Sequence, residues 1–75
     1  ILIVPNKHIN SVDVMIVDDE SLIGHLFTVA KGLAAKEGIA EGGYRLVVNT
    51  GAESGQTVFH VHLHLLGGRQ MRAMG

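Results

Sequence analysis

The sequence contains no cysteine among its 75 residues. This absence excludes a disulfide framework and any metal site built on thiolates. The chain also lacks an apolar stretch close to the ~20 residues that span a membrane, and no signal-peptide pattern is visible in it. These absences predict one small domain in the cytoplasm, without a membrane partner.

An excess of charge of one sign is missing too. Six Lys or Arg residues stand against seven Asp or Glu residues, for a net charge of −1. Proteins that bind nucleic acid usually carry a concentrated basic surface. The near balance therefore predicts that nucleic acid is not a partner.

The short length limits how the chain can be stabilised. A domain this small buries only about 60% of the surface of its unfolded chain. The chain opens on Ile1 within the apolar run 1–4, and chains seldom begin inside a buried strand. We therefore expect an upstream segment to be missing, and we expect a homodimer with the helix of residues 20–37 at or near its interface.

Hydrophobic patterning predicts four elements. Residues 1–5 are mostly β-branched aliphatics closed by a proline, which favours a buried strand. Residues 44–50 and 56–66 are predicted strands, and the short glycine-bracketed loop 51–55 between them predicts an antiparallel hairpin. With the helix 20–37 the order indicates an α+β fold, in which a helix packs on an antiparallel sheet.

The helix is predicted from an apolar stripe and from its ends. Residues 18–21, Asp-Asp-Glu-Ser, offer an N-cap and negative charge for the first turn. Gly38 can adopt the positive φ that ends a helix. Apolar residues recur at steps of four, three and four: Leu22, Leu26, Val29 and Leu33.

The segment 59–66 carries three histidines in strict alternation with aliphatic residues. On a strand, alternate side chains leave opposite faces, so Val61 and its apolar neighbours point into the core. The opposite face then presents a row of imidazoles, each able to titrate near neutral pH. This row comprises His60, His62 and His64. The remaining histidines, His8 and His25, are predicted to lie outside the site.

Three interpretations of this row are possible. It could be the polar face of a half-buried sheet, a metal site, or a site for nucleophilic catalysis at phosphorus. His60 and His64 lie roughly 13 Å apart along a flat strand, whereas Zn–N bonds are about 2.0–2.1 Å long. We therefore expect neither a metal nor another cofactor. A neutral imidazole is a good nucleophile near pH 7, which favours the third interpretation.

The motif resembles the signature of the histidine triad (HIT) family. The match comprises residues 55–66, with Asn49 upstream of them and the glycine-rich loop between. Residues 4–8 and 67–71 also resemble the Hint branch of the family. The resemblance covers essentially all 75 residues and implies that residues 1–75 are the C-terminal part of a single HIT domain.

The resemblance also implies a reaction, namely hydrolysis of the P–N or P–O bond at the α-phosphate of nucleoside monophosphate derivatives. AMP or GMP derivatives would be the substrates. By resemblance His62 is the nucleophile, His64 contacts the phosphate and the leaving group, and His60 orients its neighbour. The residues expected around the phosphate oxygens are Asn49, Gly55, Gln56 and Thr57. The alternative is a nucleotide-binding interaction module with little turnover.

Overall fold

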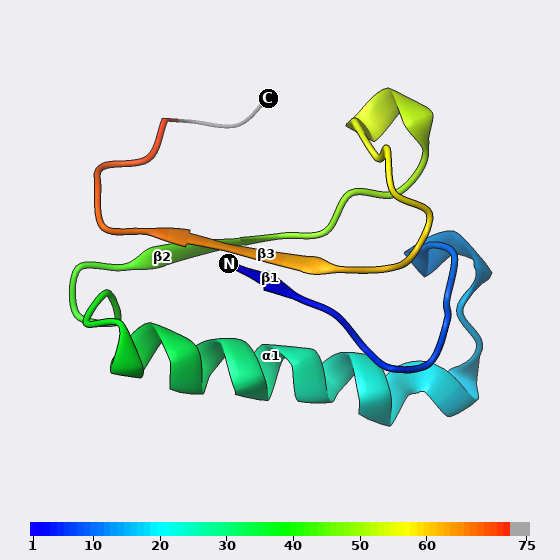
Figure 1. The fold of residues 1–75 in the computed structure, drawn as a ribbon, viewed down its shortest axis with the longest axis horizontal. Coiled ribbons are helices and arrows are strands. Elements are labelled where there is room, and N and C mark those ends of the chain that lie inside the picture. Colours follow the sequence, from blue (N-terminus) through cyan, green and yellow to red (C-terminus); the bar gives the residue numbers. More distant parts are fainter. Residues whose placement is uncertain (73–75) are drawn as a thin grey trace.

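The computed structural model describes residues 1–72, so the last three residues of the expected domain 1–75 lie outside it. One helix lies across one face of a three-stranded antiparallel sheet, whose strand order is β1-β3-β2 (Figure 1). The sequence-based prediction of an α+β fold is confirmed. The elements are β1 (Leu2–Ile3), α1 (Glu20–Lys36), β2 (Tyr44–Val47) and β3 (Leu63–Gly67), with 3-10 turns η1 (Val12–Val14), η2 (Val17–Asp19) and η3 (Ala52–Ser54).

The central strand β3 has one buried face and one open face. Leu63 lies opposite Ile3 of β1, and Leu65 lies opposite Leu46 of β2. Side chains paired across an antiparallel ladder share a face, so these residues turn together toward α1. The core cluster consists of Ile3, Leu26, Ala30 and Leu63. Because α1 covers this face, the alternate residues of β3 are left on the other one.

The predicted helix is confirmed and ends as its glycine indicates. Gly38 has φ +75°, and the Ile39 N–H donates to the Ala34 carbonyl at 3.0 Å, which closes the last turn. The helix begins at Glu20, directly after the N-cap position Asp19, as predicted. The Asp19 side chain makes no capping bond to α1, because it accepts the Ile16 N–H at 3.0 Å. No helix in the described part of the chain is long and apolar enough to cross a membrane.

The strands are shorter than the patterning predicts. The strand expected over 1–5 covers only Leu2–Ile3, the one over 44–50 ends at Val47, and the one over 56–66 begins at Leu63. The pairing of β2 with β3 is antiparallel as expected, but their connection runs from residue 48 to residue 62. Residues 56–62 lie outside the sheet, and two of their N–H groups bond to loop residues: Gln56 N–H to Gly51 O of the same loop at 3.2 Å, and Val61 N–H to Ile9 O at 2.6 Å.

Leu63 and Leu66 provide a matched test of this packing, since both are leucines of β3. Leu63 is 0% exposed and Leu66 is 42% exposed. We expect Leu63→Ala to lower the free energy of unfolding by about 2–5 kcal/mol, and Leu66→Ala to lower it far less. Urea denaturation of both variants measures the difference. Equal losses would contradict the assignment of Leu63 to the core.

Candidate active site

The histidine segment keeps its alternation even where it is not a strand. Val61, Leu63 and Leu65 are all buried, and the three histidines between and before them are half-buried on the other side. Burial of the aliphatic side chains thus holds residues 60–65 in an extended course. The structure places His60, His62 and His64 on the common face that the sequence predicts.

His62 is oriented by the backbone of its own segment. Its Nδ1 lies 2.7 Å from the carbonyl oxygen of His60. A carbonyl only accepts hydrogen bonds, so Nδ1 carries the hydrogen, and the neutral ring keeps its lone pair on Nε2. The His64 ring stands edge-on to that of His62, with centroids 4.9 Å apart. The pair therefore presents a ring nitrogen with a lone pair beside a second imidazole.

His60 is held from the N-terminal part of the chain. Its Nε2 donates to the Pro5 carbonyl oxygen at 3.0 Å. The ring of His8 packs edge-on against it, with centroids 5.0 Å apart. His8 is exposed, and its contact with His60, which lies 52 positions away, is one that the sequence does not predict. His25 lies exposed on α1, as predicted.

Loop 49–57 carries the other residues that the sequence predicts in the site. It bends at Gly51 and Gly55, whose φ angles of +83° and +96° are open to glycine without strain, and it contains η3. Asn49 is half-buried, whereas Gly55 and Thr57 are exposed and free to meet a ligand.

Gln56 differs from these neighbours because it is only 4% exposed. Its Oε1 accepts the Gly51 N–H at 2.7 Å, and its Nε2 donates to Asn10 O at 2.9 Å and to Val58 O at 3.1 Å. Its backbone N–H donates to Gly51 O. The sequence predicts Gln56 among the phosphate-binding residues, but every donor of this residue already has a partner within the protein.

The segment 5–10 supports both halves of the site through backbone carbonyls. Pro5 O accepts from His60, Ile9 O accepts from the Val61 N–H, and Asn10 O accepts from Gln56. These three bonds to the site use only backbone carbonyls of the segment, so the side chains at Pro5, Ile9 and Asn10 do not reveal them. Segment 5–10 therefore aligns the histidines with loop 49–57.

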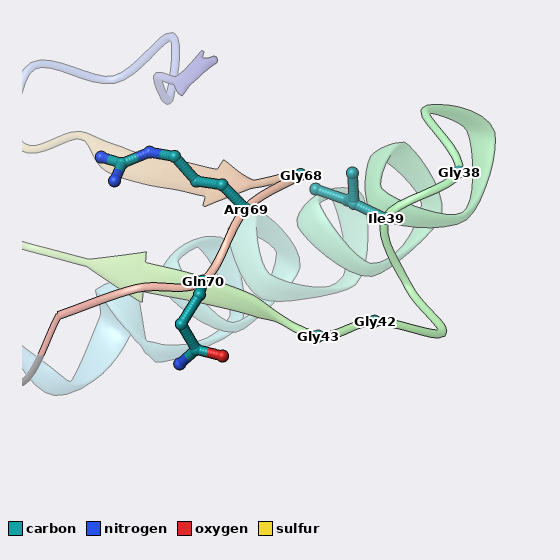
Figure 2. Close-up of a pocket in the computed structure, with 7 residues that line it drawn as sticks. All are labelled: Gly38, Ile39, Gly42, Gly43, Gly68, Arg69 and Gln70. Carbon is teal, nitrogen blue, oxygen red and sulfur yellow. The ribbon is translucent and has the colours of Figure 1, made fainter.

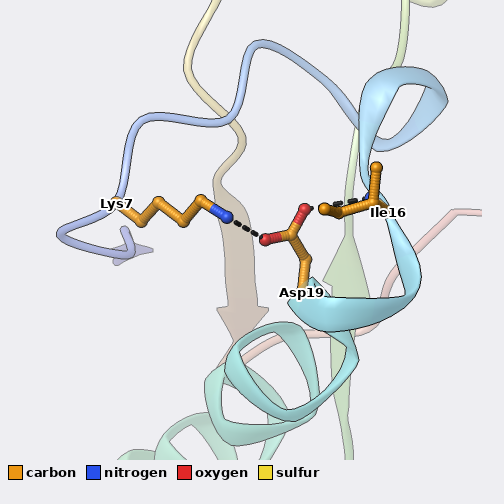
Figure 3. Close-up of polar contacts among 3 residues, drawn as sticks. All are labelled: Lys7, Ile16 and Asp19. Atoms are coloured by element: carbon orange, nitrogen blue, oxygen red, sulfur yellow. Dashed lines mark hydrogen bonds and ion pairs between the residues drawn. The ribbon is translucent and has the colours of Figure 1, made fainter.

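An ion pair anchors segment 5–10 to the start of the helix. Lys7 Nζ lies 2.5 Å from Oδ1 of the buried Asp19, whose other oxygen accepts the Ile16 N–H (Figure 3). The Ile16 hydrogen bond, followed by the Lys7 ammonium, holds the pKa of the Asp19 carboxyl below its usual value of 3.8. The folded state thus favours the ionised form of the Asp19 carboxyl.

Two cavities of the described residues are lined by residues other than the histidine triad. A cavity of about 310 Å³ lies at the far end of β3, between the turn after α1 and the turn after β3 (Figure 2). It is lined by Gly38, Ile39, Gly42, Gly43, Gly68, Arg69 and Gln70. Another, of about 220 Å³, borders Lys7 and His8. No group of three or more His, Cys, Asp or Glu residues within 1–72 could hold a metal ion.

The lowered pKa of Asp19 predicts a pH dependence of stability. Its ionised form stabilises the fold fully above the unfolded pKa near 3.8, and this contribution is lost as pH falls through the lower folded pKa. We expect Asp19→Asn to be less stable at neutral pH and to lose less stability on acidification than the unaltered protein. Denaturation at a series of pH values measures this. The exposed neighbour gives the control Asp18→Asn, and identical profiles for both variants would contradict the prediction.

Comparison with known proteins places this geometry in a family. The HIT domain profile matches residues 1–71. The chain is 49% identical over 74 residues to purine nucleoside phosphoramidase of Escherichia coli K12, and this match covers 99% of the chain and 62% of that protein. It is 46% identical over 71 residues to an uncharacterized HIT-like protein of Synechococcus elongatus, covering 95% of the chain and 61% of that protein.

Solved structures agree. A HIT family hydrolase from Legionella pneumophila superimposes with a TM-score of 0.92 at 51% identity, covering 95% of this chain and 63% of that one. A histidine triad protein from Clostridium difficile superimposes with a TM-score of 0.93 at 30% identity, and the match covers 99% of this chain and 64% of that one. The chain thus spans a little over three fifths of the length of these relatives. With a family match across nearly all of its residues, it belongs to the histidine triad family.

Proposed function

We propose that this protein hydrolyses the P–N or P–O bond at the α-phosphate of nucleoside monophosphate derivatives. The observation that carries the proposal is the hydrogen bond from His62 Nδ1 to the His60 carbonyl, which leaves Nε2 free to attack. The similarity to a purine nucleoside phosphoramidase supports a phosphoramidate of AMP or GMP as substrate. The oriented lone pair favours an enzyme over a nucleotide-binding module with little turnover.

The proposed reaction has two displacements at phosphorus. His62 Nε2 forms a bond to the α-phosphorus while the bond to the leaving group breaks, which gives a nucleotidyl-histidine. The imidazole of His64, whose ring lies 4.9 Å from that of His62, contacts the phosphate and the departing group. Water then attacks the same phosphorus, breaks the N–P bond and releases the nucleoside monophosphate. Covalent catalysis of this kind replaces one difficult step by two easier ones.

Charge that develops on the phosphate oxygens needs hydrogen-bond donors. We assign this role to Asn49, Thr57 and the backbone at Gly55, all within loop 49–57, which precedes the histidine segment in the connection from β2 to β3. No Asp or Glu occurs within residues 56–66 to act as a base for direct attack by water. This composition also favours the route through His62.

His62→Ala tests the nucleophile. Its side chain lies on the face opposite the buried residues, so the variant should fold, yet its turnover should fall at least ~10³-fold, as for a lost catalytic nucleophile. His64→Ala should cost about 10²–10³-fold, as for a lost oxyanion donor. Release of AMP or GMP from nucleoside phosphoramidates measures both, with dinucleoside polyphosphates as comparison substrates and His25→Ala as the control.

The configuration of the product at phosphorus is a second test of the covalent route through His62. Each in-line displacement inverts the configuration at phosphorus, so two successive displacements retain it. A P-chiral phosphorothioate substrate should therefore give a product of retained configuration. Net inversion, or near-full activity in His62→Ala, would replace the covalent route by direct attack of water.

We also propose that the protein acts as a homodimer in the cytoplasm. The apolar stripe of α1 packs on its own sheet through Leu26, Ala30 and Ala34, so this stripe does not require a partner. The outward Phe27 of α1 is 43% exposed, and β2 pairs only with β3 among the described strands. A second subunit that extends the sheet at β2 would place both helices near the interface.

Sedimentation equilibrium tests the dimer. We expect a dimer at micromolar concentration. Pairing β2 of one subunit with β2 of the other would give hydrogen-bond partners to the unpaired backbone groups of both strands and would bury apolar side chains between the subunits. Phe27→Glu should weaken the dimer if α1 lies at the interface, and Phe59→Glu, at an exposed aromatic residue that is not part of α1, is the control. A purely monomeric protein at micromolar concentration would rule the proposal out.

A further inference from the structure

Gln56 lies where loop 49–57 meets segment 5–10, buried beneath the loop that we assign to the phosphate. We propose that Gln56 is a positioning residue, which fixes this loop against the support of the nucleophile and makes no contact with the phosphate. The inference rests on the proposed function for its catalytic consequence. Its structural part stands on the hydrogen bonds of Gln56 alone.

The first argument is the number of donors. A glutamine side chain has two N–H donors, and a phosphate oxygen without a proton can only accept. Both Nε2 donors are engaged, with Asn10 O and Val58 O, and the backbone N–H is engaged with Gly51 O. Turning the side chain toward a phosphate would leave two carbonyl oxygens without this partner.

The second argument is what Gln56 joins. Its Oε1 holds the N–H of Gly51, the residue at which loop 49–57 reverses, and Gly51 O in turn accepts from the Ser54 hydroxyl at 2.7 Å. Its Nε2 holds Asn10, next to the Ile9 carbonyl that binds the Val61 N–H. Through these bonds one side chain ties the loop to the backbone beside His60 and His62.

The consequence concerns distance. The phosphate donors lie on loop 49–57 and the nucleophile lies on the histidine segment, so catalysis depends on the spacing between them. A misplacement of about 1 Å in such an arrangement can cost about 10²-fold in rate. Donors that act on charge formed in the transition state affect kcat more than KM. Loss of Gln56 should therefore appear mainly in kcat.

Two substitutions separate the bonds of Gln56. Gln56→Glu keeps an oxygen for the Gly51 N–H but sets a carboxylate against the two carbonyls, and Gln56→Met keeps the length and removes all three bonds. We expect both to lower kcat about 10²-fold with a smaller change in KM, and to accelerate hydrogen exchange at the Gly51 amide. The matched control is Gln70→Glu, at an exposed glutamine outside both loops, which should resemble the unaltered protein.

A measurement on the unaltered protein decides the matter even if the variants fail to fold. In NMR spectra without ligand, the side-chain amide protons of Gln56 should exchange slowly and those of Gln70 rapidly. Titration with AMP should leave the Gln56 amide signals in place while those of Thr57 shift. Rapid exchange at Gln56, or direct contacts between its amide and AMP, would overturn the inference. Absence of turnover with phosphoramidates would instead count against the proposed function, because slow exchange at Gln56 does not depend on it.

Discussion

The direction of the histidines depends on the burial of the aliphatic residues between them. Val61, Leu63 and Leu65 pack beneath the segment, with Leu63 wholly enclosed between the sheet and α1. Rotating the segment by one residue would expose these side chains to water and force imidazoles into the core. The same apolar contacts that stabilise the domain therefore keep the row of histidines outward. Stability and the geometry of the site share one cause.

Burial fixes the face but not the detailed placement, which comes from segment 5–10. Its carbonyl groups accept from His60, from the Val61 backbone and from Gln56, and its lysine reaches the buried Asp19. None of these bonds belongs to a regular element. Apart from His64, which lies on β3, the site therefore lies on irregular segments that are held together by hydrogen bonds of defined direction.

The sequence predicts the helix and the facing of the histidines well, because both follow from periodic burial. It predicts the strand limits poorly, because alternation reports which side chains are buried and not which backbone groups pair. Residues 56–62 show the difference, since Val61 alternates like a strand residue yet bonds to Ile9. The contact of His8 with His60 and the role of Gln56 depend on distant backbone atoms that leave no mark in local sequence.

The bond from His60 to Pro5 has a consequence for how the chain folds. It joins residues 55 positions apart, and the Ile1 amino group reaches Leu65 across 64 positions. Contacts between such distant residues form late and slowly, because a long loop must close before they are gained. The local helix can form early, but the imidazole row acquires its final arrangement only when the two ends of the segment 1–65 have met. The arrangement that we propose for catalysis should therefore appear with the last cooperative step of folding, after the helix has formed.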